Sequence, residues 1–193
     1  MGVEPIFLIV AKIQKQLEQA ILSLSTKEKD KLLLKLITKS ELLIQQLQFQ
    51  LLEDESDLKE KREEIRNSIS RVSKMYHDTP GWMMMDMRDL NGRITNHVKI
   101  TKDKYGEVEL TLYLLNSFFD NQLPHLEKYS GKTETISQYI AKRTEFLLNK
   151  LPKLHQDYYV EFDRDINKLL ERVHAYCPAY YAKQMNLPRE WHY

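Results

Sequence analysis

An apolar residue recurs at every seventh position between residues 37 and 72, and this repeat constrains the fold more than any other feature of the chain. Its members are Ile37, Ile44, Leu51, Leu58, Ile65 and Val72. A seven-residue apolar repeat is typical of a helix that lies along a partner helix. The sequence therefore predicts an all-α protein in which long helices pack side by side, with coiled-coil character.

The small number of Gly and Pro residues also favours long helices. The chain has 5 Gly and 6 Pro in 193 residues, which is too few for many short strands joined by tight turns. At this length one domain can bury its own core without disulfides. We therefore expect residues 1–193 to form a single domain.

The boundaries of the first two helices can be predicted from local signals. Apolar residues at three- and four-residue spacing predict a helix that begins near Pro5 and ends near Leu24. Ser25 and Glu28 then form a capping-box pattern, which predicts the start of a second helix. The seven-residue phase favours one continuous helix from there to about His77. Polar residues near 53–57, with Asp57 as a cap, allow a break instead.

The segment Thr79-Pro80-Gly81 predicts a chain reversal, because Pro cannot continue a helix and Gly accepts the turn. A second seven-residue repeat runs from Met84 to Phe119 and favours a long helix from about Trp82 to about Lys128. A β-hairpin at residues 98–112 is the alternative, because apolar and polar residues also alternate there around a turn-like stretch.

The remaining third of the chain continues the helical pattern. Thr133 can cap a helix that reaches Leu151, where Pro152 either kinks the helix or opens a new one, and the helical pattern stops before Pro178. A short amphipathic piece follows at residues 179–185. The complete prediction is an elongated antiparallel helical bundle of three long helices, with an N-terminal helix and a short C-terminal helix packed on it.

Bulk properties exclude several classes of protein. With Lys+Arg 29 against Asp+Glu 28, the net charge of +1 provides no field for coating nucleic acid. Cys177 is the only cysteine, so no intramolecular disulfide can form, and a cytoplasmic or other reducing compartment fits best. The apolar run at residues 6–11 is too short to span a membrane and lacks the flanks of a secretory signal.

The residue patterns that resemble catalytic or metal sites are incomplete. The pair His77-Asp78 lacks the upstream His that a His-Asp phosphohydrolase needs. Glu171 and His174 form one half of a di-iron motif, and the other half is missing. Cys177, one helical turn after His174, is expected to be a packed thiol. We therefore predict no catalytic residue, no metal ligand and no cofactor.

Two groups of residues suit binding better than catalysis. One is a stripe of lysines at four-residue steps, opposed along the chain by an acidic block at residues 53–64. The other consists of aromatic and Met side chains near residue 82 and at the C-terminus, which are typical of adaptable interfaces. Solubility and core packing are the simpler explanations of both. The predicted partner-binding residues are Lys27, Lys31, Lys35, Lys39, Trp82, Met83, Tyr180, Tyr181, Trp191 and Tyr193.

These patterns favour a non-catalytic helical interaction protein, such as an adaptor, an inhibitor or an effector-type binding module. It would act through surface complementarity with a protein partner. The protein partner could be a second copy of the chain in a homodimer, since helices with seven-residue repeats often pair with themselves. The second hypothesis is a peripheral membrane-binding module that uses the lysine stripe on anionic lipid. The third is a helical metal-dependent enzyme.

Overall fold

The computed structural model describes residues 13–192, and every regular element in that range is helical. Nine α-helices and two short 3₁₀ helices are present among the described residues, with no strand, so the all-α prediction is confirmed and the hairpin at 98–112 is wrong. The start of the predicted first helix at Pro5 and the apolar run at 6–11 lie outside the described residues. The chain divides into two compact units, Met1–Gln45 and Gln46–Tyr193. The expectation of a single domain stays a prediction.

The N-terminal unit contains α1 (Lys15–Ser23), α2 (Thr26–Ile37) and the start of α3 (Glu41–Leu52). The predicted capping box begins α2: the Ser25 hydroxyl accepts from the Glu28 amide, and the Glu28 carboxylate accepts from the Ser25 amide at 2.9 Å. The hydrogen bonds from Ser25 hold the pKa of Glu28 below its usual value. None of the described residues of this unit is buried.

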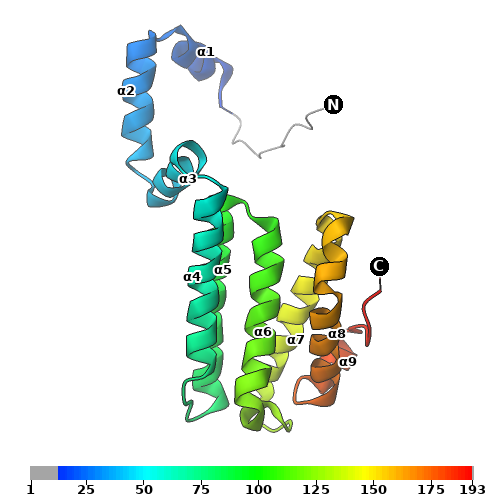
Figure 1. Cartoon of the computed structure of the whole chain (residues 1–193). Coiled ribbons are helices and arrows are strands. Elements are labelled where there is room, and N and C mark those ends of the chain that lie inside the picture. The colour runs from blue at the N-terminus through cyan, green and yellow to red at the C-terminus, as the bar shows by residue number, and fades with distance from the viewer. Residues whose placement is uncertain (1–12, 193) are drawn as a thin grey trace. The chain divides into compact units, whose positions relative to one another are not determined.

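The C-terminal unit is built around α6 (Lys104–Leu126), which packs against four other helices of the unit. These neighbours are α4 (Glu55–Ser73), α5 (Pro80–Thr101), α7 (Glu134–Lys150) and α8 (Tyr159–Ala175). In Figure 1 these helices run alongside one another, with the short α9 (Ala179–Gln184) at the end of α8. The 3₁₀ turns Leu151–Lys153 and Gln156–Tyr158 connect α7 to α8, where Pro152 had indicated a kink or a new start.

The core of the C-terminal unit is continuous and mostly aliphatic. Phe118, Leu110 and Leu114 of α6 lie at its centre with at most 1% of their surface exposed. Met83 and Met87 of α5 fill it from one side. Because α6 is covered on several faces, its buried residues do not form a single stripe. Burial of this kind is the main source of stability in a helical domain.

The predicted long helix up to His77 is wrong, because the chain breaks twice. Residues 38–40 separate α2 from α3, and Glu53 and Asp54 separate α3 from α4. Asp54 caps α4 by accepting from the Ser56 and Asp57 amides, while the Asp57 carboxylate accepts from the Asp54 amide at 2.8 Å. The break therefore falls within the predicted 53–57 window, with Asp54 as the cap in place of Asp57.

The predicted helix from Trp82 to Lys128 is also two helices. Thr79 caps α5 through the Trp82 amide, which confirms the reversal at Thr79-Pro80-Gly81. Lys102 then adopts a left-handed conformation with φ 60°, and Asp103 caps α6. A second irregularity lies at Gln122, where Pro124 follows and the buried Gln122 amide donates to the carbonyls of Ser73 and Met75. These two side-chain hydrogen bonds connect the kink in α6 to the residues at the end of α4 and just after it.

The contrast between the two units predicts very different costs of shortening a side chain. We expect Leu110→Ala to lower the free energy of unfolding by about 2–5 kcal/mol, because it leaves a cavity in a closed core. The same change at Leu34, which is 65% exposed in the N-terminal unit, should cost less than about 1 kcal/mol. Urea denaturation followed by circular dichroism measures the free energy of unfolding of both variants. Equal losses of stability would contradict the contrast between the closed core and the exposed N-terminal unit.

Candidate interaction surfaces

The most unusual surface of the molecule is apolar and belongs to the N-terminal unit. Seven large apolar side chains of its described residues are between 37% and 65% exposed. We call this set the N-terminal apolar surface; it consists of Ile13, Leu17, Leu22, Leu33, Leu34, Leu36 and Leu42. Single exposed leucines are normal on a soluble protein, whereas a cluster in a unit whose described residues include no buried one is a candidate interaction surface.

Two of its leucines border a groove between α1 and α2. The groove has a volume of about 310 Å³ and is lined mainly by apolar side chains, including Ile21, Leu33 and Leu36. Lys29 also lines the groove, and its ammonium group donates to the Leu22 carbonyl at 2.9 Å. This bond links α2 to α1.

The predicted lysine stripe lies on α2, with Lys39 just after the helix, and all four of its side chains are exposed. Within the described residues, none of Lys27, Lys31, Lys35 and Lys39 forms an ion pair. At 100° per residue, Leu34 lies beside Lys27 and Lys31, whereas Leu33 and Leu36 lie on the opposite side of the helix. The lysine stripe and the leucines of the groove therefore face in different directions.

The acidic block at residues 53–64 is divided by the structure into paired and unpaired carboxylates. Glu55 pairs with Lys59 at 3.3 Å, and Glu53 pairs with Lys61 at 3.0 Å. Three other carboxylates of α4 are exposed and form no ion pair within the described residues. We call them the acidic face; they are Glu60, Glu63 and Glu64.

The other predicted binding residues are dispersed over the C-terminal unit. Trp82 and Tyr180 are exposed, at 61% and 60%. Met83 is completely buried in the core, so its side chain has no surface to offer a partner, and this part of the prediction is corrected. Tyr181 is half-buried, and its hydroxyl donates to Glu134 at 3.2 Å. Tyr193 lies outside the described residues.

Trp191 is part of an intramolecular contact that fastens the C-terminus to α8. Its amide donates to the Asn167 side-chain oxygen at 2.8 Å, and its carbonyl accepts from the Asn167 amide nitrogen at 3.3 Å. Its ring lies edge-on to Tyr159, with centroids 5.4 Å apart. Some of the aromatic residues near the C-terminus therefore make contacts within the fold.

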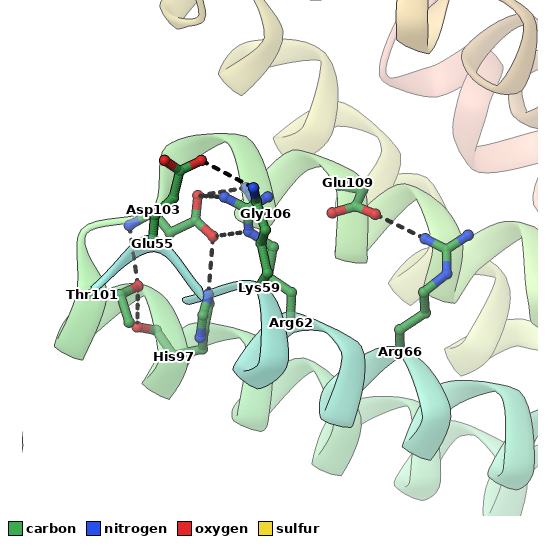
Figure 2. A network of polar contacts seen from close by, with 9 residues as sticks. All are labelled: Glu55, Lys59, Arg62, Arg66, His97, Thr101, Asp103, Gly106 and Glu109. Atoms are coloured by element: carbon green, nitrogen blue, oxygen red, sulfur yellow. Dashed lines mark hydrogen bonds and ion pairs between the residues drawn. The ribbon is translucent and has the colours of Figure 1, made fainter. Parts of the chain in front are cut away.

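The most connected polar group is the Asp103 carboxylate, at the turn between α5 and α6 (Figure 2). Arg62 of α4 binds it with two nitrogens, at 2.6 and 3.2 Å, and His97 of α5 contacts it at 3.1 Å. The Gly106 amide donates to it at 2.8 Å as the cap bond of α6. Figure 2 also shows Arg66 bound to Glu109 one turn further along.

The electrostatics of this network keep Asp103 charged. Burial alone raises the pKa of its carboxyl, but the hydrogen bonds from His97, Gly106 and Arg62 outweigh burial and hold the pKa below its usual value. Beside it, burial and the hydrogen bond to Glu161 raise the pKa of the Tyr105 hydroxyl, so this group stays protonated. The Asp103 carboxylate thus joins three helices, α4, α5 and α6.

The structure also places the residues that had resembled catalytic motifs. His77 is buried and contacts Asp86, with Nε2 and Oδ2 3.0 Å apart, and not Asp78. His174 contacts the Pro188 carbonyl at 3.0 Å. Cys177 is buried, as expected, and burial raises the pKa of its thiol. No group of three or more His, Cys, Asp or Glu in residues 13–192 is arranged to hold a metal ion.

Two open grooves with mixed charge line the C-terminal unit. One, of about 630 Å³, lies between α4 and α5 and includes Arg88, Arg93 and Glu64. The other, of about 650 Å³, lies between α8 and the C-terminal segment and includes Arg164, Glu171 and Arg189. Neither combines an enclosed apolar wall with converging polar groups, as small-molecule sites usually do. None of the described helices is both long enough and apolar enough to cross a membrane.

A comparison of the chain with protein-family models, with curated proteins and with solved structures finds no match.

The crowding at Asp103 predicts opposite effects of the same substitution at two glycines. A Cβ at Gly106 would lie 2.1 Å from an Asp103 carboxylate oxygen, whereas a Cβ at Gly92 in α5 would meet nothing within 4 Å. We expect Gly106→Ala to destabilise the protein, since the carboxylate must leave its partners. Gly92→Ala should add about 0.5–1 kcal/mol by its helix propensity. Thermal unfolding measures the stability of the two variants. If both substitutions stabilised the protein, the predicted crowding at Gly106 would be wrong.

The lowered pKa of Asp103 predicts a loss of stability in acid. A carboxyl whose folded pKa lies below its unfolded value of about 4 contributes stability above that pH and loses it as the pH falls through the folded pKa. Asp103→Asn should lower the free energy of unfolding at pH 7 by about 3–5 kcal/mol. It should also flatten the decline below about pH 4. Urea titrations across this range test it, and parallel pH profiles for the two proteins would contradict the assignment.

Proposed function

We propose that the protein is a non-catalytic helical interaction module that binds a protein partner through its N-terminal apolar surface. The observation that carries the proposal is the combination of seven exposed large apolar side chains and no buried residue in the described part of the N-terminal unit. Helices of this length are marginal in water without tertiary packing. A partner that covers these helices supplies the packing that the unit itself lacks.

The energetic argument depends on the leucines. Completing the burial of a half-exposed leucine contributes roughly 1 kcal/mol, so the seven side chains together offset a substantial part of the cost of association. The partner that fits is another helical surface with apolar side chains, received as a helix in a groove. The lysines beside Leu34 favour a partner with carboxylates next to its apolar residues.

An anionic membrane surface is the second candidate. The specific observation in its favour is the position of the exposed Leu34 next to Lys27 and Lys31 on α2, since interfacial helices combine apolar and cationic side chains. The net charge of +1 and the exposed acidic face weaken the attraction of the whole chain to anionic lipid.

Site-specific photo-cross-linking tests the proposal. We replace Leu34 with the photoreactive residue p-benzoylphenylalanine and, as a matched control of similar exposure, place the same probe at Val160 of the C-terminal unit. The probe at position 34 should form protein adducts, and Leu33→Ser with Leu36→Ser in the same chain should remove them. The probe at position 160 should form few adducts.

Adducts of equal yield at both positions, or none at position 34, would refute a protein-binding role for the N-terminal apolar surface. Flotation with vesicles of anionic lipid at low salt is run in parallel. Flotation that depends on Lys31 and Lys35, in the absence of adducts, would favour the membrane candidate.

A further inference from the structure

Three turns of the C-terminal unit lie at the same end of its helices. They are the α4–α5 turn at residues 74–79, the α6–α7 turn at residues 127–133 and the α8–α9 turn at residues 176–178. Gln122, in the last part of α6, donates to the carbonyls of Ser73 and Met75. The Cys177 amide donates to the Leu126 carbonyl at 2.9 Å. Figure 1 shows the three turns together, at the bottom of this unit.

This end of the unit carries exposed aromatic and methionine side chains. Six large hydrophobic residues, in the three turns or in the first two helical turns that follow them, are between 49% and 87% exposed. We call them the end cluster; they are Met75, Tyr76, Trp82, Met85, Tyr129 and Tyr180. The rings of Tyr129 and Tyr180 lie 5.9 Å apart although they belong to different segments. The end cluster therefore combines side chains that are far apart in the sequence.

The composition of the end cluster is typical of a protein surface that meets lipid headgroups. Trp and Tyr combine a large apolar ring with a polar tip, and both are enriched at membrane–water interfaces. None of the six residues lines one of the grooves described above. Because they are carried by several turns at one end of the unit, they are suited to a broad surface rather than to a single peptide in a groove.

The charges within the three turns are nearly balanced. Lys74, Lys128 and Lys132 are exposed and form no ion pair within the described residues. Asp78 and Glu127 are also exposed, and neither forms an ion pair in that range. A zwitterionic headgroup carries a phosphate and an ammonium group, so it offers a partner to both signs of charge. A strongly anionic surface would attract the lysines and repel the carboxylates.

We propose that this end of the C-terminal unit docks on a zwitterionic lipid surface. The end cluster enters the boundary between headgroups and acyl chains, and the three lysines contact headgroup phosphates. Binding then depends mainly on the insertion of side chains and only weakly on salt, in contrast to binding through the lysine stripe of α2. The contact uses residues of the C-terminal unit alone and does not rest on the proposed function.

Flotation of the full chain with vesicles of phosphatidylcholine tests the proposal. The unmodified protein should float with the vesicles at physiological salt. Tyr76→Ala with Trp82→Ala should lower the partition coefficient about ten-fold or more, because the two rings supply much of the inserted apolar area. The matched control is Leu52→Ala with Val160→Ala, at side chains that are 81% and 67% exposed, against 87% and 61% for Tyr76 and Trp82. The control should bind like the unmodified protein, and circular dichroism checks that both variants fold.

The fluorescence of Trp82 provides a second measurement that leaves the end cluster unchanged. The chain has 2 Trp, so Trp191→Phe makes Trp82 the single tryptophan and keeps an aromatic ring beside Tyr159. Phosphatidylcholine with brominated acyl chains should quench this fluorescence. The emission should also shift to shorter wavelengths as the indole ring leaves water.

Four outcomes would overturn the inference. The first three are an unmodified protein that does not float, equal losses in the two double variants, and bound protein whose Trp82 is not quenched. Flotation that is lost with Lys31→Gln and Lys35→Gln but kept with the Trp82 variant would assign the lipid contact to the lysine stripe instead.

A photoreactive probe at position 82 distinguishes lipid from protein. Protein adducts at this position without vesicle binding would show that the end cluster contacts a protein, and would also overturn the inference. The adducts expected at position 34 belong to the N-terminal apolar surface and do not depend on any of these results. Failure of this inference is therefore distinguishable from failure of the proposed function.

Discussion

The buried carboxylate of Asp103 is the interaction on which the arrangement of the C-terminal unit depends. It caps α6 through the Gly106 amide, binds Arg62 of α4 and contacts His97 of α5. A buried carboxylate without partners would be severely destabilising, so each of these contacts is needed to offset its desolvation. Because the three partners come from three helices, satisfying one charge also sets the positions of α4, α5 and α6 relative to one another.

The same turn explains why a left-handed residue is tolerated there. Lys102 has φ 60°, which costs a residue with a Cβ on the order of 1 kcal/mol. The chain must reverse within two residues so that Asp103 can reach both neighbouring helices, and the charge-assisted bonds outweigh that cost. The core formed by α5 and α6, with Met87, Leu90 and Leu110 buried, follows from this reversal.

Much of the local structure could be predicted from residues that act on their own neighbours. Ser25 with Glu28, and Thr79 with Pro80, mark helix starts by local hydrogen bonds and by the fixed proline angle, and both are confirmed. The continuity of the long helices could not be predicted in this way. A seven-residue repeat carries no signal for a break: the spacing continues from α5 into α6 although Lys102 and Asp103 separate the two helices, and one member of the first repeat, Leu51, is 70% exposed.

The burial and the partners of individual site residues could not be predicted from the sequence either. Met83 and Trp82 are adjacent, yet one is fully buried and the other is 61% exposed, because successive residues of a helix point about 100° apart. The sequence did not indicate the rotation of α5 in the core, which decides which of the two side chains is buried. The partners of Asp103 lie 41 residues away at Arg62 and 6 residues away at His97, and no local pattern connects them. Only the packed structure brings them together.

The two units differ in how their polar and apolar groups are satisfied, and this difference leads to the functional proposal. In the C-terminal unit, charged residues such as Arg172 and Lys150 bond to partners within the unit while the aliphatic residues form a closed core. In the N-terminal unit, Lys27, Lys31 and Lys35 of α2 form no ion pair among the described residues, and none of the described leucines is buried. Folding stability requires that apolar surface be removed from water and rewards the pairing of charge where geometry permits. A chain that satisfies both requirements in one unit and neither in the other is suited to completing the second unit by association.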